Sequence, residues 1–362
     1  MPHDLPDRMA AVQLTGHGGP ERLIYREDVP VPRPGPGEVV IRIGAAGVNN
    51  TDINTRLGWY SKSVTGATGE EAAASAAAED GSWTGVPLAF PRIQGADACG
   101  RIVAVGEGVE PARLGERVLV RPMQADPASS SPVACLTFGS EIDGGFAQYA
   151  RVRAPEAYRV NSPLSDAELA SFPCAASTAQ NMLHRAAVKP GERVLVTGAS
   201  GGVGSAAVQL ARARGARVIA VAAAAKAEAL LALGAVRTVA RGTSLVAALG
   251  RSSVDVVLDV AAGPAWPELP EVLAPGGRYA VAGAIAGPVV PLDVRTLYLK
   301  DLTFLGCTWQ PPEVFAALVQ AIENGALQPL VARTYPLESI REAQAEFQAK
   351  THVGKLVLLP PA

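Results

Sequence analysis

The sequence is poor in cysteine, histidine and aromatic residues, and it has no long apolar run. Its 362 residues include 4 cysteines, 4 histidines and only 5% Phe, Trp and Tyr. The cysteines are widely spread without a CxxC pair, which argues against a disulfide framework and indicates reduced thiols in a cytoplasmic protein. The longest apolar run, residues 218–225, ends at Lys226, whereas a membrane-spanning helix needs about 20 residues. Acidic residues and prolines near residue 1 also predict no secretion signal.

An excess of charge of one sign is equally absent. The chain carries 32 Lys and Arg against 34 Asp and Glu, a net charge of −2, and has no long basic run. We therefore expect neither a broad nucleic-acid surface nor an anionic-membrane surface. With 48% hydrophobic residues, 37 Gly and 29 Pro, the chain can bury large cores and is rich in turns. Its length predicts about two domains.

The pattern of strands and turns changes near residue 165. Before it, short strands separated by Gly and Pro turns predict an antiparallel, barrel-like domain, with strands at 39–43, 101–105 and 117–120. After it, strands at 193–197, 217–221, 254–260 and 278–282 alternate with helices, which predicts a doubly wound parallel sheet. The end of the chain has two helical stretches and a strand at 355–359 that we expect to return to the first domain.

An alanine-rich excursion interrupts the first domain at residues 62–86. Its polar, aperiodic composition is typical of either a mobile surface loop or a lid beside an active site. Trp83 within it, and Trp309 further along, are candidates for walls of a substrate pocket, although ordinary packing explains Trp309 equally well.

A glycine loop at residues 198–204 is the strongest functional signal. Ala199, Gly201 and Gly204 have the spacing of a GxGxxG motif, with alanine at the first place, and Gly202 and Val203 complete the loop. A strand leads directly into this loop, and the helix at 205–214 follows it. Glycine lets the backbone approach a pyrophosphate, and the helix N-terminus supplies free N–H groups. A tight turn without a ligand is the alternative interpretation.

The residues after the second strand indicate which dinucleotide binds. An NAD site usually has Asp or Glu there for the ribose 2′-hydroxyl, whereas this chain has four alanines followed by Lys226. Lys226 could meet a 2′-phosphate, and Arg241 could offer a second cation. These residues favour NADP(H), although Lys226 could also be an ordinary solvated lysine at a helix start.

Several motifs along the chain occur together: GVNNTD at 47–52, RLGWY at 56–60, GADACG at 95–100, DGGFA at 143–147, STA at 177–179, the glycine loop, and HVGKLV at 352–357. With these motifs, the chain resembles the zinc-independent medium-chain dehydrogenase/reductase superfamily, close to its quinone oxidoreductase branch, over nearly its whole length. This resemblance implies a GroES-like β-barrel-type catalytic domain at 1–165, completed by 309–362, and a Rossmann cofactor domain at 166–308, with nicotinamide chemistry in the cleft.

Alcohol dehydrogenases of this superfamily carry a catalytic zinc, and the resemblance places their three ligands at Asn49, Ala96 and Cys174. One ligand out of three cannot hold zinc in tetrahedral geometry. The excursion at 122–140, where a structural zinc lobe would lie, holds only Cys135. We therefore expect no metal at either site.

Without a Lewis acid, alcohol oxidation becomes harder, whereas a quinone or an enone spreads the incoming charge onto its own oxygen. The leading hypothesis is an NADPH-dependent reductase of quinones or α,β-unsaturated carbonyl compounds. Tyr60 is the candidate proton donor or oxyanion partner, with water as the alternative proton source. Asn49 is expected to hydrogen-bond near the reacting centre. Asp52 is expected to orient its loop or to make a structural turn bond.

The resemblance also assigns cofactor contacts outside the glycine loop. Thr178, Gly283 and Cys307 are expected near the nicotinamide, and Lys355 either contacts the cofactor or pairs on the surface. Rival functions are an enoyl-thioester reductase, a zinc-independent alcohol or aldehyde dehydrogenase, and a non-catalytic NADPH-binding sensor. A homodimer is the usual oligomeric state in this family, so the resemblance implies a homodimer joined along an apolar edge strand at 302–307.

Overall fold

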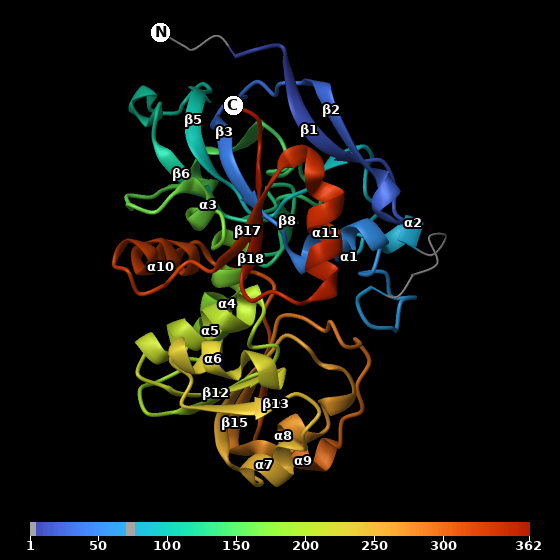
Figure 1. The fold of residues 1–362 in the computed structure, drawn as a ribbon, viewed down its shortest axis with the longest axis vertical. Helices are drawn as coiled ribbons and strands as arrows, with labels where there is room; N and C mark the ends of the chain where they lie inside the picture. The colour runs from blue at the N-terminus through green and yellow to red at the C-terminus, as the bar shows by residue number, and fades with distance from the viewer. Residues whose placement is uncertain (1–4, 70–76) are drawn as a thin grey trace. The chain divides into compact units, whose positions relative to one another are not determined.

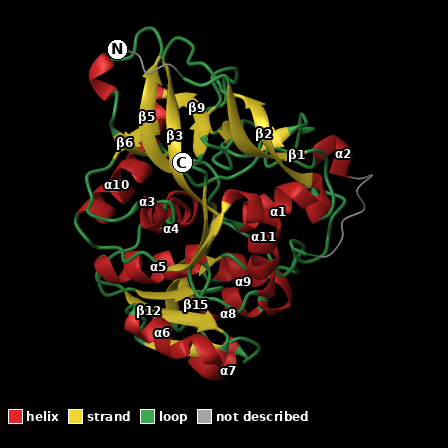
Figure 2. Ribbon diagram, turned by 45° about the horizontal axis from the view of Figure 1, so that its top comes forward, coloured by secondary structure: helices red, strands yellow, loops and turns green. Residues whose placement is uncertain are grey.

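The computed structural model describes residues 5–69 and 77–362, which form two compact units. Unit 1 comprises the described parts of residues 1–64, 71–174 and 329–362, and unit 2 comprises the described parts of residues 65–70 and 175–328. Figure 2 shows that strands dominate unit 1, whereas helices surround the strands of unit 2. The change that the sequence predicts, from short strands to strands alternating with helices, is therefore present in the fold.

Unit 1 is built from mainly antiparallel sheets around one apolar core. Short strands form because buried Val, Ile and Ala residues are interrupted by turns, as at Gly37, whose φ of 72° favours glycine. A three-stranded sheet has the order β2-β1-β4, and a seven-stranded sheet has the order β10-β6-β5-β3-β18-β17, with β9 also pairing with β3. The strands are β1 (Arg8–Leu14), β2 (Leu23–Pro30), β3 (Glu38–Gly47), β4 (Arg92–Ile93), β5 (Cys99–Val105), β6 (Arg117–Val120), β9 (Tyr149–Arg153), β10 (Ala157–Arg159), β17 (Val331–Pro336) and β18 (Lys355–Leu359), besides the hairpin of β7 (Met123–Ala125) and β8 (Cys135–Thr137).

The C-terminal strand β18 returns to the first domain, as the sequence predicts. It pairs antiparallel with β3, where Val357 lies opposite Gly47, and parallel with β17. Its residues Leu356, Val357 and Leu358 are fully buried. This pairing places Lys355 beside the end of β3 and the start of helix α1 (Asn50–Leu57). The other helices of this unit are α2 (Ala77–Asp80), α3 (Asp166–Leu169) and α11 (Ile340–Ala349).

Unit 2 contains a six-stranded sheet in which every neighbouring pair is parallel, in the order β13-β12-β11-β14-β15-β16. This confirms the predicted Rossmann-type sheet. Right-handed crossovers place α5 and α6 on one face and α7, α8 and α9 on the other, and Figure 1 shows these two groups apart. The strands are β11 (Arg193–Val196), β12 (Arg217–Ala222), β13 (Arg237–Ala240), β14 (Val254–Asp259), β15 (Leu273–Val281) and β16 (Thr303–Gly306). The helices are α4 (Pro173–Arg185), α5 (Gly202–Ala213), α6 (Ala227–Ala232), α7 (Leu245–Leu249), α8 (Glu268–Val272), α9 (Val294–Leu299) and α10 (Pro312–Glu323).

The compact units differ from the expected domain ranges at residues 65–69 and 166–174 and, over the longest stretch, at residues 309–328, which include α10. This segment belongs to unit 2 because side chains of α4 and α5 hold its two ends. Asn181 Nδ2 donates to Trp309 O (3.0 Å), and the backbone N–H of Gln328 donates to Gln209 Oε1 (2.8 Å). The chain therefore leaves unit 2 only after α10.

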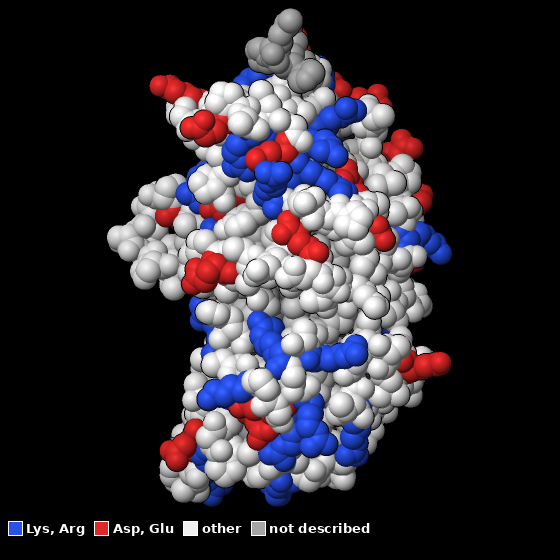
Figure 3. All heavy atoms as spheres, turned by 90° about the vertical axis from the view of Figure 1, so that its left-hand side faces the viewer, with Lys and Arg blue, Asp and Glu red and all other residues white. Residues whose placement is uncertain are grey.

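Residues 70–76 of the excursion at 62–86 lie outside the described residues, so the choice between loop and lid remains a prediction. The flanking residues are tied to their surroundings, because Lys62 N donates to Asp80 Oδ2 and Thr84 N donates to Glu141 Oε1, both at 3.0 Å. Among the described helices, none is long and apolar enough to cross a membrane. On the face drawn in Figure 3, Lys and Arg lie interspersed with Asp and Glu.

Candidate functional site

A buried polar cluster lies in unit 1 where β18, β3 and α1 meet. At its centre is the ammonium group of Lys355, whose residue is only 4% exposed. Lys355 Nζ lies 2.8 Å from Val48 O and 2.8 Å from Asp97 Oδ2, and it also donates to Asn49 Oδ1. An ammonium group has three donors, and these three acceptors use all of them. Lys355 is thus not a surface residue, so the expected surface pair is wrong, and its three donors are engaged within the cluster.

The amide of Asn49 is fixed in one orientation by its neighbours. Its Oδ1 accepts from Lys355, while its Nδ2 donates to Asp97 Oδ2 (2.7 Å) and to Gly47 O (3.2 Å). Both amide hydrogens are therefore engaged within the cluster. Asn49 was expected to hydrogen-bond near the reacting centre, but it has no hydrogen left to donate to a substrate oxygen.

Asp52 lies in the first turn of α1 and is 2% exposed. Its Oδ2 accepts a hydrogen bond of 2.7 Å from the backbone N–H of Asn49, which closes the start of the helix. Burial raises the pKa of Asp52 to about 7, against the opposing effects of that hydrogen bond and of Lys355. This hydrogen bond fits both roles expected of Asp52, orienting its loop and making a structural turn bond, so the choice between them stays a prediction.

Tyr60 sits in an aromatic corner just after α1. Its ring packs 4.9 Å from that of Trp83 and 5.7 Å from that of Trp59, measured between centroids. Its hydroxyl donates to Thr51 Oγ1 at 3.1 Å. Burial raises the pKa of Tyr60 above its ordinary value, so the hydroxyl keeps its proton at neutral pH. Thr51 was missed by sequence reasoning, because a single threonine beside two asparagines carries no distinctive signal.

The residues at the three expected zinc positions do not form a metal site. Asn49 is engaged by Lys355, and Ala96 has no ligand atom. Cys174 is buried, and burial raises the pKa of its thiol, which disfavours the thiolate that binds zinc. Its backbone N–H donates to Asp97 Oδ1 at 2.5 Å. Within residues 5–69 and 77–362, no three His, Cys, Asp or Glu side chains are arranged to hold a metal ion.

The glycine loop of unit 2 lies between β11 and α5, at the carboxyl edge of the parallel sheet. Gly198 adopts a φ of 56°, and α5 begins at Gly202, with Gly201 as its N-cap and no side chain capping it. A Cβ on Gly204 would lie 2.3 Å from Gly198 O, whereas one on Gly201 would meet only that oxygen, at 3.5 Å. Gly204 is thus needed for packing, while Gly201 leaves open space beside the helix N-terminus. This cradle fits a dinucleotide pyrophosphate.

Lys226 and Arg241 follow neighbouring strands of the same sheet edge. Val221 lies opposite Val239 in the β12 and β13 register, and the backbone N–H of Arg241 donates to Ala222 O at 2.7 Å. Burial and the nearby charge of Arg241 lower the pKa of Lys226. Two cations held together in this way are suited to a dianionic phosphate.

The other three expected cofactor residues also lie in unit 2. Gly283 packs against the chain after β14, since a Cβ there would lie 3.0 Å from Val260 O. Thr178 lies on α4, where its Oγ1 accepts from Gln310 Nε2 at 3.5 Å. Cys307 follows β16 and is 4% exposed, and burial raises the pKa of its thiol to about 11.

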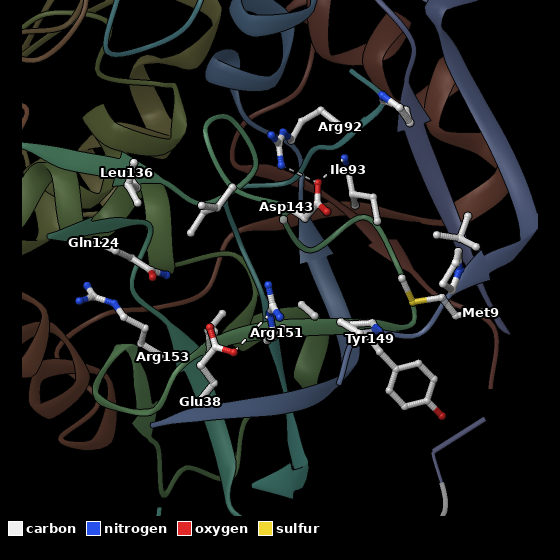
Figure 4. A pocket seen from close by; sticks show the side chains of 18 of the residues that line it. Met9, Glu38, Arg92, Ile93, Gln124, Leu136, Asp143, Tyr149, Arg151 and Arg153 are labelled. Carbon is white, nitrogen blue, oxygen red and sulfur yellow. Dashed lines mark hydrogen bonds and ion pairs between the residues drawn. The ribbon is translucent and has the colours of Figure 1, made fainter. Parts of the chain in front are cut away.

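A cavity of about 500 Å³ in unit 1 shares no lining residue with the polar cluster. Figure 4 shows its charged side chains, and Arg92 is paired with Asp143 (2.9 Å) while Arg151 is paired with Glu38 (3.4 Å). Arg153 on the same wall is paired with Glu156 at 2.8 Å, so each charged side chain that lines the cavity has a partner of opposite sign. We therefore assign no catalytic role to this cavity.

Comparisons with known proteins agree with this layout. A family model described as alcohol dehydrogenase GroES-like domain matches residues 35–162, and one described as zinc-binding dehydrogenase matches residues 202–324. The chain is 30% identical to quinone oxidoreductase of Lama guanicoe over 97% of each chain. It is 28% identical to acryloyl-coenzyme A reductase of Metallosphaera sedula, over 97% of this chain and 99% of that protein.

A solved structure named as a candidate alcohol dehydrogenase of Sinorhizobium meliloti 1021 is similar throughout. It is 47% identical, covers 99% of this chain and 98% of its own, and superposes with a TM-score of 0.89. The similarity to relatives with these different names extends over both units.

Proposed function

Because the chain belongs to the medium-chain dehydrogenase/reductase superfamily, in its quinone oxidoreductase-like branch, and is thus an oxidoreductase that uses a nicotinamide cofactor, we propose a more specific activity. The protein is an NADPH-dependent reductase that transfers a hydride to a quinone or an α,β-unsaturated carbonyl compound without zinc. Overall, NADPH, a proton and the acceptor give NADP⁺ and the acceptor reduced by two electrons.

The position of Lys355 carries this proposal. Its ammonium group is held by Asn49, Asp97 and the carbonyl of Val48, in the cluster that contains the expected metal positions. Zinc-assisted alcohol oxidation needs three ligands and an open coordination place, and this donor set offers neither. A quinone or enone needs less assistance, because conjugation spreads the incoming negative charge onto its oxygen.

The preference for NADPH is supported by Lys226 and Arg241. Both are cations at the ends of β12 and β13, where the ribose of the adenosine half binds in Rossmann folds. Residues 222–225 are all alanine, so the carboxylate that would bond a 2′-hydroxyl is replaced by apolar methyl groups. Replacing Lys226 and Arg241 together by alanine should lower kcat/KM for NADPH by about 10- to 100-fold, and kcat/KM for NADH should change less than threefold.

When bound, the nicotinamide supplies the hydride, and the chain's own residues hold the substrate and direct the proton. The Tyr60 hydroxyl stays protonated and serves as a hydrogen-bond donor to the substrate oxygen, in exchange for its bond to Thr51. Trp83 supports the Tyr60 ring and offers a flat apolar surface for a conjugated substrate. Water delivers the proton, because the raised pKa of Tyr60 makes it a poor acid. Asp52 and Lys355 fix the start of α1, from which Thr51 and Tyr60 follow.

The direct test measures NADPH oxidation at 340 nm against four acceptors, with zinc content determined on the same sample. The acceptors are a naphthoquinone, a simple enone, a crotonyl thioester and an aldehyde. Turnover of the quinone or the enone by zinc-free protein is the expected result. Turnover confined to the aldehyde, or one bound zinc per chain, would overturn the proposal. Cofactor binding without any turnover would instead identify a sensor protein.

Reduction of an enoyl thioester is the second candidate, favoured by the similarity to acryloyl-coenzyme A reductase over 97% of this chain. An enoyl thioester is also an α,β-unsaturated carbonyl compound, so the same residues would act on it. A crotonyl thioester reduced at least tenfold more efficiently than the simple enone would favour this candidate.

We also propose that the protein is a cytoplasmic homodimer. Within the described chain, β16 pairs only with β15 and forms an edge of the parallel sheet. The segment before it exposes apolar side chains: Val289 is 72% exposed, Leu299 71%, Val294 60% and Tyr298 59%. Such a patch beside an open strand favours association between copies. Gel filtration and light scattering should report a mass near twice 37.2 kDa, and a monomer would contradict this proposal.

A further inference from the structure

A second fully buried carboxylate, that of Asp259, lies in unit 2 at the end of β14. Its Oδ1 accepts from Thr197 Oγ1 at 2.5 Å, and its Oδ2 accepts from the Tyr279 hydroxyl at 2.7 Å. The backbone N–H groups of Ala261 and Ala262 also donate to it, at 2.9 to 3.2 Å. All these donors are neutral. A buried carboxylate bound by so many neutral donors holds its surroundings in one arrangement, because losing any bond leaves a buried charge less well solvated.

The bond between Thr197 and Asp259 spans the point where the strand order of the sheet reverses. β11 and β14 are neighbours, with β12 and β13 on one side and β15 and β16 on the other. In open α/β sheets, dinucleotides bind outside the carboxyl ends of the strands at this switch point, with one half of the ligand on each side. Thr197 directly follows β11 and begins the glycine loop, and Asp259 ends β14. The bond therefore links the two halves of the cofactor cradle.

The turn that follows Asp259 needs this carboxylate to keep its shape. Ala262 has φ 50° and ψ −134°, a conformation that costs a residue with a side chain free energy and persists only where the surroundings enforce it. Its N–H donates to both oxygens of Asp259, at 3.1 and 3.2 Å. This turn also holds the loop after β15, because the backbone N–H of Ala286 donates to Ala261 O at 2.9 Å.

Close packing links this turn to both neighbouring loops. A Cβ on Gly198 would lie 2.9 Å from Val260 Cγ2, and a Cβ on Gly283 would lie 3.0 Å from Val260 O. Val260 is thus packed between the glycine loop and the loop after β15. Because β11 and α5 anchor the glycine loop, a small rotation of the turn would displace the loop after β15 relative to it.

We propose that Asp259 is a positioning residue that sets the loop after β14 relative to the glycine loop, and thereby the affinity for the nicotinamide half of the cofactor. The adenosine half, which Lys226 and Arg241 serve on the far side of the switch point, is bound independently of it. This inference rests on the proposed NADPH cofactor.

Thr197 offers a matched pair of variants that test the bond without burying an unpaired charge. Thr197→Val keeps the shape of the side chain but removes the hydroxyl, and Thr197→Ser keeps the hydroxyl. We expect Thr197→Val to raise the Kd for NADPH about tenfold or more, because it removes both the hydrogen bond to Asp259 and the acceptor of the Val260 N–H, which donates to Thr197 Oγ1 at 3.1 Å. Thr197→Ser keeps both bonds and should stay within twofold of the unsubstituted protein. The Kd for adenosine 2′,5′-bisphosphate, which lacks the nicotinamide, should be unchanged in both.

Asp259→Asn should raise the Kd for NADPH more than Thr197→Val does, and Asp255→Asn is its control. Asp255 lies on the same strand, but it pairs with Arg193 at 2.8 Å and not with either loop. If Asp259 had a merely structural role, Asp259→Asn would weaken the binding of NADPH and of the bisphosphate equally, or would lower the unfolding temperature without changing either Kd. Either result would overturn the inference. If Asp259→Asn does not fold, the Thr197 pair decides alone.

The same titrations separate failure of this inference from failure of the proposed cofactor. An unsubstituted protein that binds NADH and not NADPH refutes the NADPH proposal, and the comparison is then made with NADH and adenosine 5′-monophosphate. An unsubstituted protein that binds neither dinucleotide refutes both proposals. Binding by the unsubstituted protein with equal losses in Thr197→Val and Thr197→Ser refutes only the role of Asp259.

Discussion

Replacing Lys355 by methionine tests how far the polar cluster of unit 1 depends on its one cation. Methionine has a similar length and no charge, so Lys355→Met removes the ammonium group while filling most of its space. Asp97, which is fully buried, would keep the N–H of Cys174 and the amide of Asn49 as donors but would lose its ion pair. Val48 O would also lose its donor.

The expected cost follows from the burial of both partners. Removing one member of a buried ion pair typically destabilises a protein by about 3–5 kcal/mol, because an uncompensated charge remains inside. Lys355 is 4% exposed and Asp97 is fully buried, so solvent does little to reduce this cost. Since about 1.4 kcal/mol corresponds to a factor of ten, the population of the opened cluster should rise roughly a hundred- to several-thousand-fold.

Cys174 provides a local measure of that opening. Its thiol is buried beside Asp97, so it reacts with an alkylating reagent only when the cluster opens. Labelling rates at each cysteine, read by peptide mass spectrometry, should rise at Cys174 in Lys355→Met and stay constant at Cys307, which lies in unit 2. Site-resolved labelling avoids assigning a single unfolding free energy to a chain of two units.

A double substitution distinguishes loss of the ion pair from loss of packing. Asp97→Asn combined with Lys355→Met removes both charges, and an interior without either charge is often nearly as stable as the intact pair. Labelling of Cys174 in the double variant should therefore be at least tenfold slower than in Lys355→Met. Strictly additive effects of the two substitutions, or a change at Cys174 of less than fivefold in Lys355→Met, would refute the reasoning.

Three further predictions concern the glycine loop, Tyr60 and Asp52. Gly204→Ala should lower the unfolding temperature, measured by calorimetry, by several degrees because the new Cβ would overlap Gly198 O at 2.3 Å. Gly201→Ala should fold normally but weaken NADPH binding in a titration. Equal stability of the two variants would contradict this prediction. Tyr60→Phe should lower kcat about 100-fold. The pH dependence of kcat between pH 6 and 9 should not change, because the pKa of Tyr60 lies above that range. Loss of a decline in kcat at the basic end of this range would show that Tyr60 itself titrates. The folded protein raises the pKa of Asp52 to about 7, so it binds more protons than the unfolded chain between about pH 4 and 7, and stability should fall as pH rises through this window. Asp52→Asn should make the free energy of unfolding, measured by urea titration, fall less steeply with pH in this window. An unchanged dependence on pH would refute the assignment.

Local patterns in the sequence predicted the architecture well. The strand at 117–120 and the C-terminal strand at 355–359 have the expected bounds, because short apolar runs flanked by turns specify strands with little help from the rest of the chain. The strand, glycine loop and helix of the cofactor motif are likewise contiguous in sequence. By contrast, the end of unit 2 depends on hydrogen bonds that link side chains of α4 and α5 to Trp309 and Gln328, on either side of α10, which no local pattern reveals.

The interior of the polar cluster could not be predicted from the sequence. Lysine is rarely buried, and the partners of Lys355 include Val48, which is 307 positions away in the chain. The orientation of the Asn49 amide depends on Lys355 and Asp97 together, so a reading of residues 47–52 alone could not show that its hydrogens are engaged. In the same way, the bond between Thr197 and Asp259 joins residues 62 positions apart, and neither residue has a recognisable motif.

The charge balance of the cluster in turn limits the kind of substrate that the protein can reduce. Asp97 balances Lys355, and Asp52 is neutral when protonated and adds a negative charge when ionised, so the cluster has no net positive charge at any pH near 7. A developing alkoxide needs a cation or a metal ion to stabilise it, but the cluster's one cation, Lys355, already has its three donors engaged by Val48, Asn49 and Asp97. The Tyr60 hydroxyl nearby is a neutral donor, which is suited to a partial charge more than to a full one. A substrate that spreads the incoming charge over a conjugated system needs no more than that, and for this reason we favour quinones and enones over simple alcohols and aldehydes.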